Sequence, residues 1–204
     1  ESVRLFRSRG GVGTVNCNTN ASRTEAVERL AKAGLSSIRV SLNSARPEVY
    51  ERYYRPHGYS FDDVRRSIAV ARQNGLWVSL NLLFFPGVTD SEGELEALAR
   101  LVGENGVSMI QWRNLNIDPE WYLGLMRGID HGPIMGLSLF MKRLKKLCPW
   151  LRFGYFNPYV GEKAELTAPL PGQWQMPDLS VADAPLAGPA SEDAAGEADA
   201  EAGA

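Results

Sequence analysis

Three short segments, 12–18, 36–43 and 77–85, alternate apolar and polar residues with a period of two, and a fourth, 107–114, does so less clearly. Each is rich in β-branched or large apolar residues and is flanked by Gly, Pro or Asn, so each is predicted to be a β-strand. The stretches between them have helical spacing. Strands that alternate with helices in this way pair in parallel through right-handed crossovers, which predicts an α/β fold.

The predicted helices carry start and stop signals. Residues 22–25 (Ser-Arg-Thr-Glu), 60–63 (Ser-Phe-Asp-Asp) and 91–94 (Ser-Glu-Gly-Glu) each place a serine three residues before a carboxylate, which is the spacing of a capping box. Gly34 and Gly75 follow the first two helices, where a residue in the left-handed conformation commonly ends a helix. We therefore expect helices directly after residues 22, 60 and 91.

The last part of the chain has a weaker pattern. Residues 136–147 are predicted to be an amphipathic helix, and residues 151–156 favour a further strand. Residues 1–120 are thus expected to form the main β/α body, and residues 121–163 a C-terminal extension of helix and strand. Residues 164–204 are rich in Pro, Ala, Gly and acidic side chains, a composition that predicts a disordered tail.

The two faces of the predicted strands differ in chemistry, because successive side chains of a strand point to opposite sides. The apolar set comprises Ile38, Val40, Leu42, Val78, Leu80 and Leu82, and the polar set comprises Arg39, Ser41, Asn43, Ser79, Asn81, Gln111 and Arg113. Burying such polar groups unpaired would cost about 1–3 kcal/mol each. The sequence therefore predicts either a polar lumen that holds a ligand or water, or a sheet with its polar face in solvent.

Polar residues also gather where each predicted strand ends, at residues 18–20, 41–44, 86–90 and 113–116. Ligands of parallel α/β proteins bind at the carboxyl ends of the strands. Asn, Ser, Gly and Asp are also ordinary turn and cap residues, which explains Ser44, Asp90 and Ser91. Side chains within strands, such as Ser41 and Asn81, are less well explained in that way.

Charge and cysteine content narrow the function classes. Up to Lys163 there are 22 basic and 16 acidic residues, whereas 8 acidic residues and no basic one follow. No apolar run is long enough to cross a membrane and no leader pattern opens the chain, so a cytoplasmic protein is expected. Cys17 and Cys148 are the only cysteines, which excludes a disulfide framework. Membrane partners are not expected, and nucleic acid is not indicated.

Four motifs in this order resemble the radical S-adenosylmethionine (SAM) superfamily: NCNTNAS, IRVSLNSA followed by YERYYRP, VSLNLLFFPGVTDSEGELE and IQWRNLNIDP. The resemblance covers about residues 12–120 and implies a partial (β/α)₆ TIM-like barrel, of which this chain holds strands three to six. It also implies a [4Fe–4S] cluster and SAM, whose reductive cleavage yields a 5′-deoxyadenosyl radical that abstracts hydrogen from the substrate. A small-molecule or peptide substrate and a reductant such as ferredoxin or flavodoxin are expected partners.

The resemblance also assigns cofactor-binding residues, all at or near strand ends. Ser41 and Asn43 match the end of the strand that contacts ribose and carboxylate, and Asn81 matches a polar position near the cofactor. The remaining candidates are Asn18 and Asn20 after the first strand, Arg113 and Asn114 at the fourth, and the adenine-facing stretch 83–87.

One departure from the family concerns the cluster. The family holds its cluster with CxxxCxxC, and this motif does not occur in the chain. We expect the ligands, and barrel strands one and two, upstream of Glu1, and we expect the isolated chain to have no radical activity. Two alternatives remain open. One is a degenerate barrel that binds a nucleotide-like ligand without redox chemistry, and the other is a non-radical barrel lyase or isomerase.

Overall fold

The computed structural model describes residues 1–155 and 166–183. These residues form a five-stranded parallel sheet in the order β1-β2-β3-β4-β5, which follows the chain. The strands are β1 (Asn16–Thr19), β2 (Ser37–Leu42), β3 (Trp77–Phe84), β4 (Met109–Asn114) and β5 (Arg152–Phe153). A parallel sheet that alternates with helices confirms the predicted α/β class. Its sequential strand order is that of a partial (β/α) barrel, because a doubly wound sheet reverses direction along its strand order.

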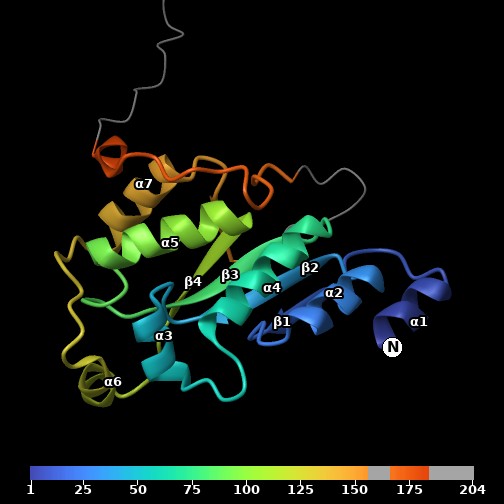
Figure 1. Cartoon of the computed structure of the whole chain (residues 1–204), viewed down its shortest axis with the longest axis horizontal. Coiled ribbons are helices and arrows are strands. Elements are labelled where there is room, and N and C mark those ends of the chain that lie inside the picture. The colour runs from blue at the N-terminus through green and yellow to red at the C-terminus, as the bar shows by residue number, and fades with distance from the viewer. Residues whose placement is uncertain (156–165, 184–204) are drawn as a thin grey trace, which may run out of the picture.

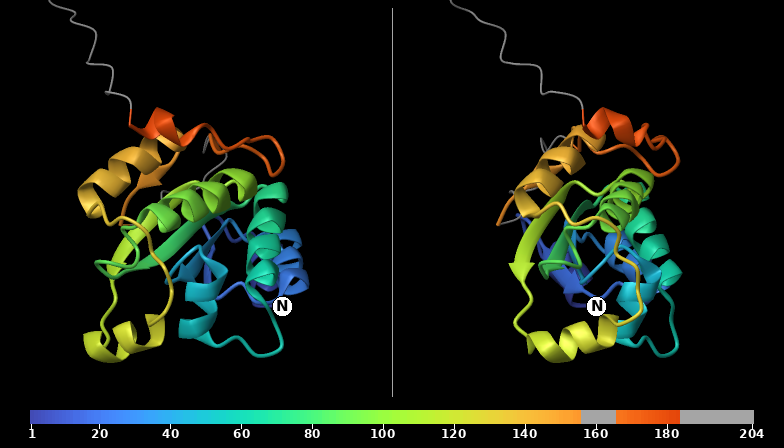
Figure 2. Two further views of the ribbon diagram at one scale, coloured as in Figure 1. Left: turned by 60° about the vertical axis from the view of Figure 1, so that its left-hand side comes forward. Right: turned by 90° about the vertical axis from the view of Figure 1, so that its left-hand side faces the viewer.

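The long helices lie on one side of the sheet (Figures 1 and 2). They are α2 (Thr24–Lys32), α4 (Phe61–Gln73), α5 (Glu92–Asn105) and α7 (Leu137–Leu147), and the shorter elements are α1 (Ser2–Ser8), α3 (Pro47–Tyr54), α6 (Pro119–Met126) and the 3₁₀ turn η1 (Leu179–Ala182). Within the described ranges no helix covers the opposite face, which we call the open face (Figure 2). No described helix combines the length and apolarity that a membrane span requires.

The core lies between the sheet and these helices. Ile38, Val40 and Leu42 of β2 are fully buried there, together with Val78 and Leu80 of β3. A smaller cluster, in which Val49 of α3 packs with Tyr122 and Met126 of α6, lies beside the carboxyl ends of the strands. The predicted division of β2 and β3 into an apolar and a polar face is thus confirmed, and the polar face is the open face.

Two local predictions differ from the structure at the start of the fold. The first strand begins at Asn16 rather than residue 12, because Gly13 has φ of +96° and Val12 is exposed before the chain enters the sheet. The predicted capping box at residues 22–25 is wrong. Helix α2 begins at Thr24 with Arg23 as its N-cap. The Thr24 hydroxyl instead contacts the Asp63 carbonyl oxygen at 3.3 Å and Ser67 Oγ at 3.1 Å on α4.

The other two helix starts fall where they were predicted. Ser60 and Asp63 form a complete capping box at α4. Ser91 caps α5, but the carboxylate of Glu94 does not return to the N-cap and instead enters the core. Helix α5 ends at Gly106, which has the left-handed φ of +72° that favours glycine.

The expectation of a disordered tail from residue 164 is wrong for residues 166–183. This segment lies over α5 and α7 (Figure 1), and Ala168 and Ala182 are buried in it. Arg72 of α4 donates to the Ala168 carbonyl oxygen at 2.5 Å. Trp174 packs over Gly103, where a β-carbon would clash with the indole ring. The tail from residue 184 lies outside the described residues.

Candidate functional site at the carboxyl ends of the strands

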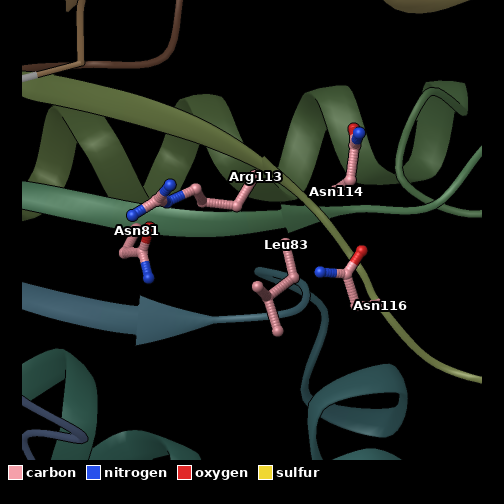
Figure 3. A pocket seen from close by; sticks show the side chains of 5 residues that line it. All are labelled: Asn81, Leu83, Arg113, Asn114 and Asn116. Carbon is pink, nitrogen blue, oxygen red and sulfur yellow. The ribbon is translucent and has the colours of Figure 1, made fainter.

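A pocket of about 390 Å³ lies at the carboxyl ends of β3 and β4. Its lining residues are Asn81, Leu83, Arg113, Asn114 and Asn116 (Figure 3). Four of these five side chains are amides or a guanidinium, so the pocket offers hydrogen-bond donors and acceptors rather than an apolar surface.

Three polar side chains form a row across the open face beside this pocket. The strand register places Ser41 next to Asn81 and Asn81 next to Gln111. Asn81 Oδ1 and both side-chain polar atoms of Gln111 are buried and have no hydrogen-bond partner among the described residues. Buried polar groups are normally paired. The unpaired amides therefore mark a place where a polar ligand or water completes the structure.

Two arginines share the open face with this row. Arg39 of β2 is in register with Ser79, and Arg113 lies two residues beyond Gln111 on β4. The Arg113 side chain extends back across β3 toward Asn81 (Figure 3). Burial, and to a smaller extent the positive charge of Arg113, lower the pKa of Arg39. Arg113 Nη1 donates to Tyr155 Oη at 3.0 Å.

The two asparagines at the edge strand are held differently. Asn18 lies on the open face in register with Arg39, and its Oδ1 accepts a hydrogen bond from Asn16 Nδ2 at 3.0 Å. Asn20 lies beyond β1, where its Oδ1 accepts from the Ser22 backbone N–H at 3.2 Å. The structure thus places Asn18 on the site's face, whereas Asn20 shapes the turn that leads to α2.

Asn43 has left the face on which sequence parity had placed it. β2 ends at Leu42, and the Asn43 side chain is fully buried beyond it. Its Nδ2 donates to the Val49 carbonyl oxygen at 3.2 Å and to Tyr122 Oη at 3.3 Å. Asn43 therefore joins the end of β2 to α3 and α6, and it does not reach the pocket.

Asn114 and Arg113 point to opposite sides of the strand although both line the pocket. In Figure 3 the Asn114 side chain lies on the side of β4 away from Leu83. The structure thus brings Asn81, Arg113 and Asn114 together. The strand pattern of the sequence placed Arg39 and Gln111 on the polar face but did not indicate that they bind a ligand, and it did not indicate Asn116. The polar repeat Asn114-Leu115-Asn116 was the available signal for Asn116.

A buried carboxylate fixes the loop that follows β2. Glu94 of α5 is fully buried, accepts from the Ala45 backbone N–H at 2.7 Å and is hydrogen-bonded to the Ser44 hydroxyl. Burial raises the pKa of Glu94 to about 7, although the Ser44 and Ala45 hydrogen bonds act in the opposite direction. This long-range contact positions the strand end that carries Ser41.

Residues 1–101, about half of the chain, match the model of the radical SAM superfamily. The chain belongs to this superfamily. The match includes Ser41 and Asn81 but ends within α5, before Arg113 and Asn114 of β4. Among curated proteins, none matches the sequence significantly.

Three solved structures are among those that resemble this chain. HydG, a maturase of the [FeFe]-hydrogenase, is 17% identical, with a TM-score of 0.49 over 74% of this chain and 35% of its own. Elp3 of the archaeon Methanocaldococcus infernus is 16% identical, with a TM-score of 0.47 over 70% and 35%. A radical SAM methyltransferase from Sphaerobacter thermophilus is 20% identical, with a TM-score of 0.41 over 68% and 40%. This chain thus spans between one third and two fifths of their lengths.

The family's two cofactors fit this chain unequally. A [4Fe–4S] cluster requires cysteine thiolates, and Cys17 and Cys148 are the only cysteines of the chain. Cys148 is fully buried, and its burial raises the pKa of the thiol to about 12. The described residues contain no group of three side chains suited to a metal ion, so these residues do not fit the cluster. The unpaired amides of the open face do fit a ligand as rich in hydrogen-bonding groups as SAM.

Proposed function

We propose that the open face of the sheet binds SAM, and that the chain is part of a radical SAM enzyme. The observation that carries this proposal is the adjacent pair Asn81 and Gln111, whose buried polar atoms lack partners beside a polar pocket. Membership of the radical SAM superfamily is a second line of support, because SAM is the cofactor that the whole superfamily shares.

The side chains that would hold SAM are those that the fold presents together. Ser41, Asn81 and Gln111 form the row across β2, β3 and β4, and Asn114 borders the pocket beside it. Their hydroxyl and amide groups complement the adenine nitrogens, ribose hydroxyls and carboxylate of SAM. When bound in enzymes of this family, SAM supplies a 5′-deoxyadenosyl radical that abstracts hydrogen from a substrate.

Calorimetric titration of SAM into the 204-residue chain tests this proposal. Replacing the amides in Asn81→Leu and Gln111→Leu should weaken SAM binding by about tenfold or more, because each amide is worth at least one hydrogen bond to the ligand. The same variants should stabilise the unliganded chain, because each removes buried polar atoms that have no partner. Weaker SAM binding together with higher stability of the unliganded chain would identify an amide that binds the ligand. Replacing an amide that only supports the fold would lower the stability instead.

Gln73→Leu is the matched control, because Gln73 is an exposed amide at the end of α4 on the helix side of the sheet. It should leave SAM binding unchanged. Unchanged SAM affinity in both open-face variants would contradict the proposal, and so would the absence of binding by the unaltered chain.

We propose further that the cluster ligands are cysteines outside these 204 residues. The chain alone, given iron, sulfide and a reductant such as ferredoxin or flavodoxin, should release no 5′-deoxyadenosine. Release of this product would overturn the proposal. The cysteine content also favours a second candidate, a non-redox face for a nucleotide-like ligand. That candidate predicts that adenosine or ATP binds at least as tightly as SAM, whereas the first predicts a preference for SAM.

A further inference from the structure

The open face carries two arginines that the described chain does not neutralise. Arg39 and Arg113 project from β2 and β4 and flank β3. The two groups are close enough for the charge of Arg113 to act on Arg39. The Arg113 side chain is exposed and extends back across β3 toward Asn81 (Figure 3). The fold therefore places two positive charges near each other on the same face of the sheet.

Several arginines elsewhere in the described chain have acceptors for their guanidinium groups. The Arg46, Arg65, Arg66, Arg100 and Arg143 guanidiniums pair with carboxylates, and Arg7, Arg52 and Arg72 donate to backbone carbonyl oxygens. Within residues 1–155 and 166–183, neither Arg39 nor Arg113 forms a salt bridge, and Arg39 Nε is buried without a hydrogen-bond partner. The hydrogen bond from Arg113 goes to a neutral phenol, Tyr155.

Guanidinium groups bind carboxylate and phosphate through paired, charge-assisted hydrogen bonds, which are among the strongest in proteins. An anionic group placed between Arg39 and Arg113 would satisfy the buried Nε and remove the repulsion between the two charges. SAM is not sufficient for this role. It carries a sulfonium, an ammonium and a single carboxylate, so it brings more positive charge to the face than negative.

We infer that the substrate carries an anionic group, a carboxylate or a phosphate, that binds between Arg39 and Arg113 on the open face. In assigning this group to a substrate, the inference rests on the proposed function. The anion site itself requires only the two arginines. Asn116, at the pocket beside this anion site, would contact the polar part of the substrate next to the anion.

Thermal unfolding of the 204-residue chain in increasing inorganic phosphate, or in succinate, tests the inference. Both probes should raise the melting temperature with a saturating dependence, because a ligand that binds only the folded state stabilises it. In Arg39→Gln and Arg113→Gln the half-saturating concentration should rise by about tenfold or more. Both variants should also melt higher than the unaltered chain without anion, because the repulsion has been removed.

Arg65→Gln is the matched control, since Arg65 lies on the outer surface of α4 with Asp62 and Glu104. Equal half-saturation in all variants, or no saturating effect, would overturn the inference. A SAM titration in saturating phosphate distinguishes failure of the anion site from failure of the proposed SAM site. Simultaneous binding of SAM and phosphate supports a substrate anion, whereas displacement of phosphate by SAM contradicts it. Phosphate binding without SAM binding would contradict only the proposed function.

Discussion

Glu94 should make the stability of the chain depend on pH in a defined direction. The carboxylate is fully buried at the start of α5, against Ser44 and Ala45 of the loop after β2. Burial raises its pKa from 4.5 to about 7. Between these values the folded chain binds a proton that the unfolded chain has released, so the free energy of unfolding falls as pH rises through this range.

The magnitude follows from the size of the shift. Each pKa unit corresponds to about 1.4 kcal/mol, so the shift of Glu94 lowers the free energy of unfolding by about 3 kcal/mol at about pH 8 relative to about pH 4. Glu94→Gln stays neutral at every pH, and its side-chain oxygen can still accept the Ala45 N–H. The variant should therefore be about 3 kcal/mol more stable than the unaltered chain at about pH 8 and nearly equal to it at about pH 4.

Urea unfolding of both chains at these two pH values measures the difference directly. Subtracting the two chains cancels the other titrating groups. Glu96→Gln is the control, because Glu96 is partly exposed and pairs with Arg100 on the helix surface. A stability difference between Glu94→Gln and the unaltered chain that did not change with pH would refute the reasoning.

Two further predictions concern the C-terminal segment and the thiols. Gly103→Ala should destabilise the chain by about 1–3 kcal/mol and speed proteolysis within residues 166–183, because the new methyl group displaces Trp174; unchanged cleavage would show that the segment does not depend on this contact. In the native chain at about pH 8, a thiol-specific reagent should label the half-exposed Cys17 quickly and leave the buried Cys148 unreacted until denaturant is added, and equal rates would contradict the described burial.

The sheet was predictable because its signals are local. The alternation of Ile38, Val40 and Leu42 with Arg39 and Ser41 follows from strand geometry alone, and it identified both the core face and the open face. Parity fails only where the strand itself ends. Asn43 comes directly after Leu42, the chain turns there, and the side chain enters the core toward Tyr122 of α6.

The less predictable features depend on contacts between distant residues. Glu94 had the spacing of a capping residue, but its partners Ser44 and Ala45 lie about 50 positions away in the sequence. The high content of Pro, Ala and acidic residues predicted disorder for residues 166–183. Composition does not show where the few large apolar residues of this segment pack. Trp174 over Gly103 supplies one such contact, which holds the segment against α5.

The candidate site could likewise be predicted only in part, because it depends on contacts between distant residues. Sequence could place Asn81 and Gln111 on one face, but whether their polar atoms find partners depends on every neighbour in the fold. The absence of a carboxylate near Arg39 and Arg113 within the described residues likewise became visible only when the strands were assembled.

The most direct test of the central claim is a nuclear magnetic resonance titration of the ¹⁵N-labelled chain with SAM, in which side-chain amide signals are followed. If SAM binds at the open face, the signals of Asn81 and Gln111 shift with a common saturation curve. The signal of Asn74, whose amide donates to the Val70 carbonyl oxygen on the helix side, should stay in place. Shifts at Asn74 without shifts at Asn81 and Gln111, or no shifts at all, would contradict SAM binding at the open face.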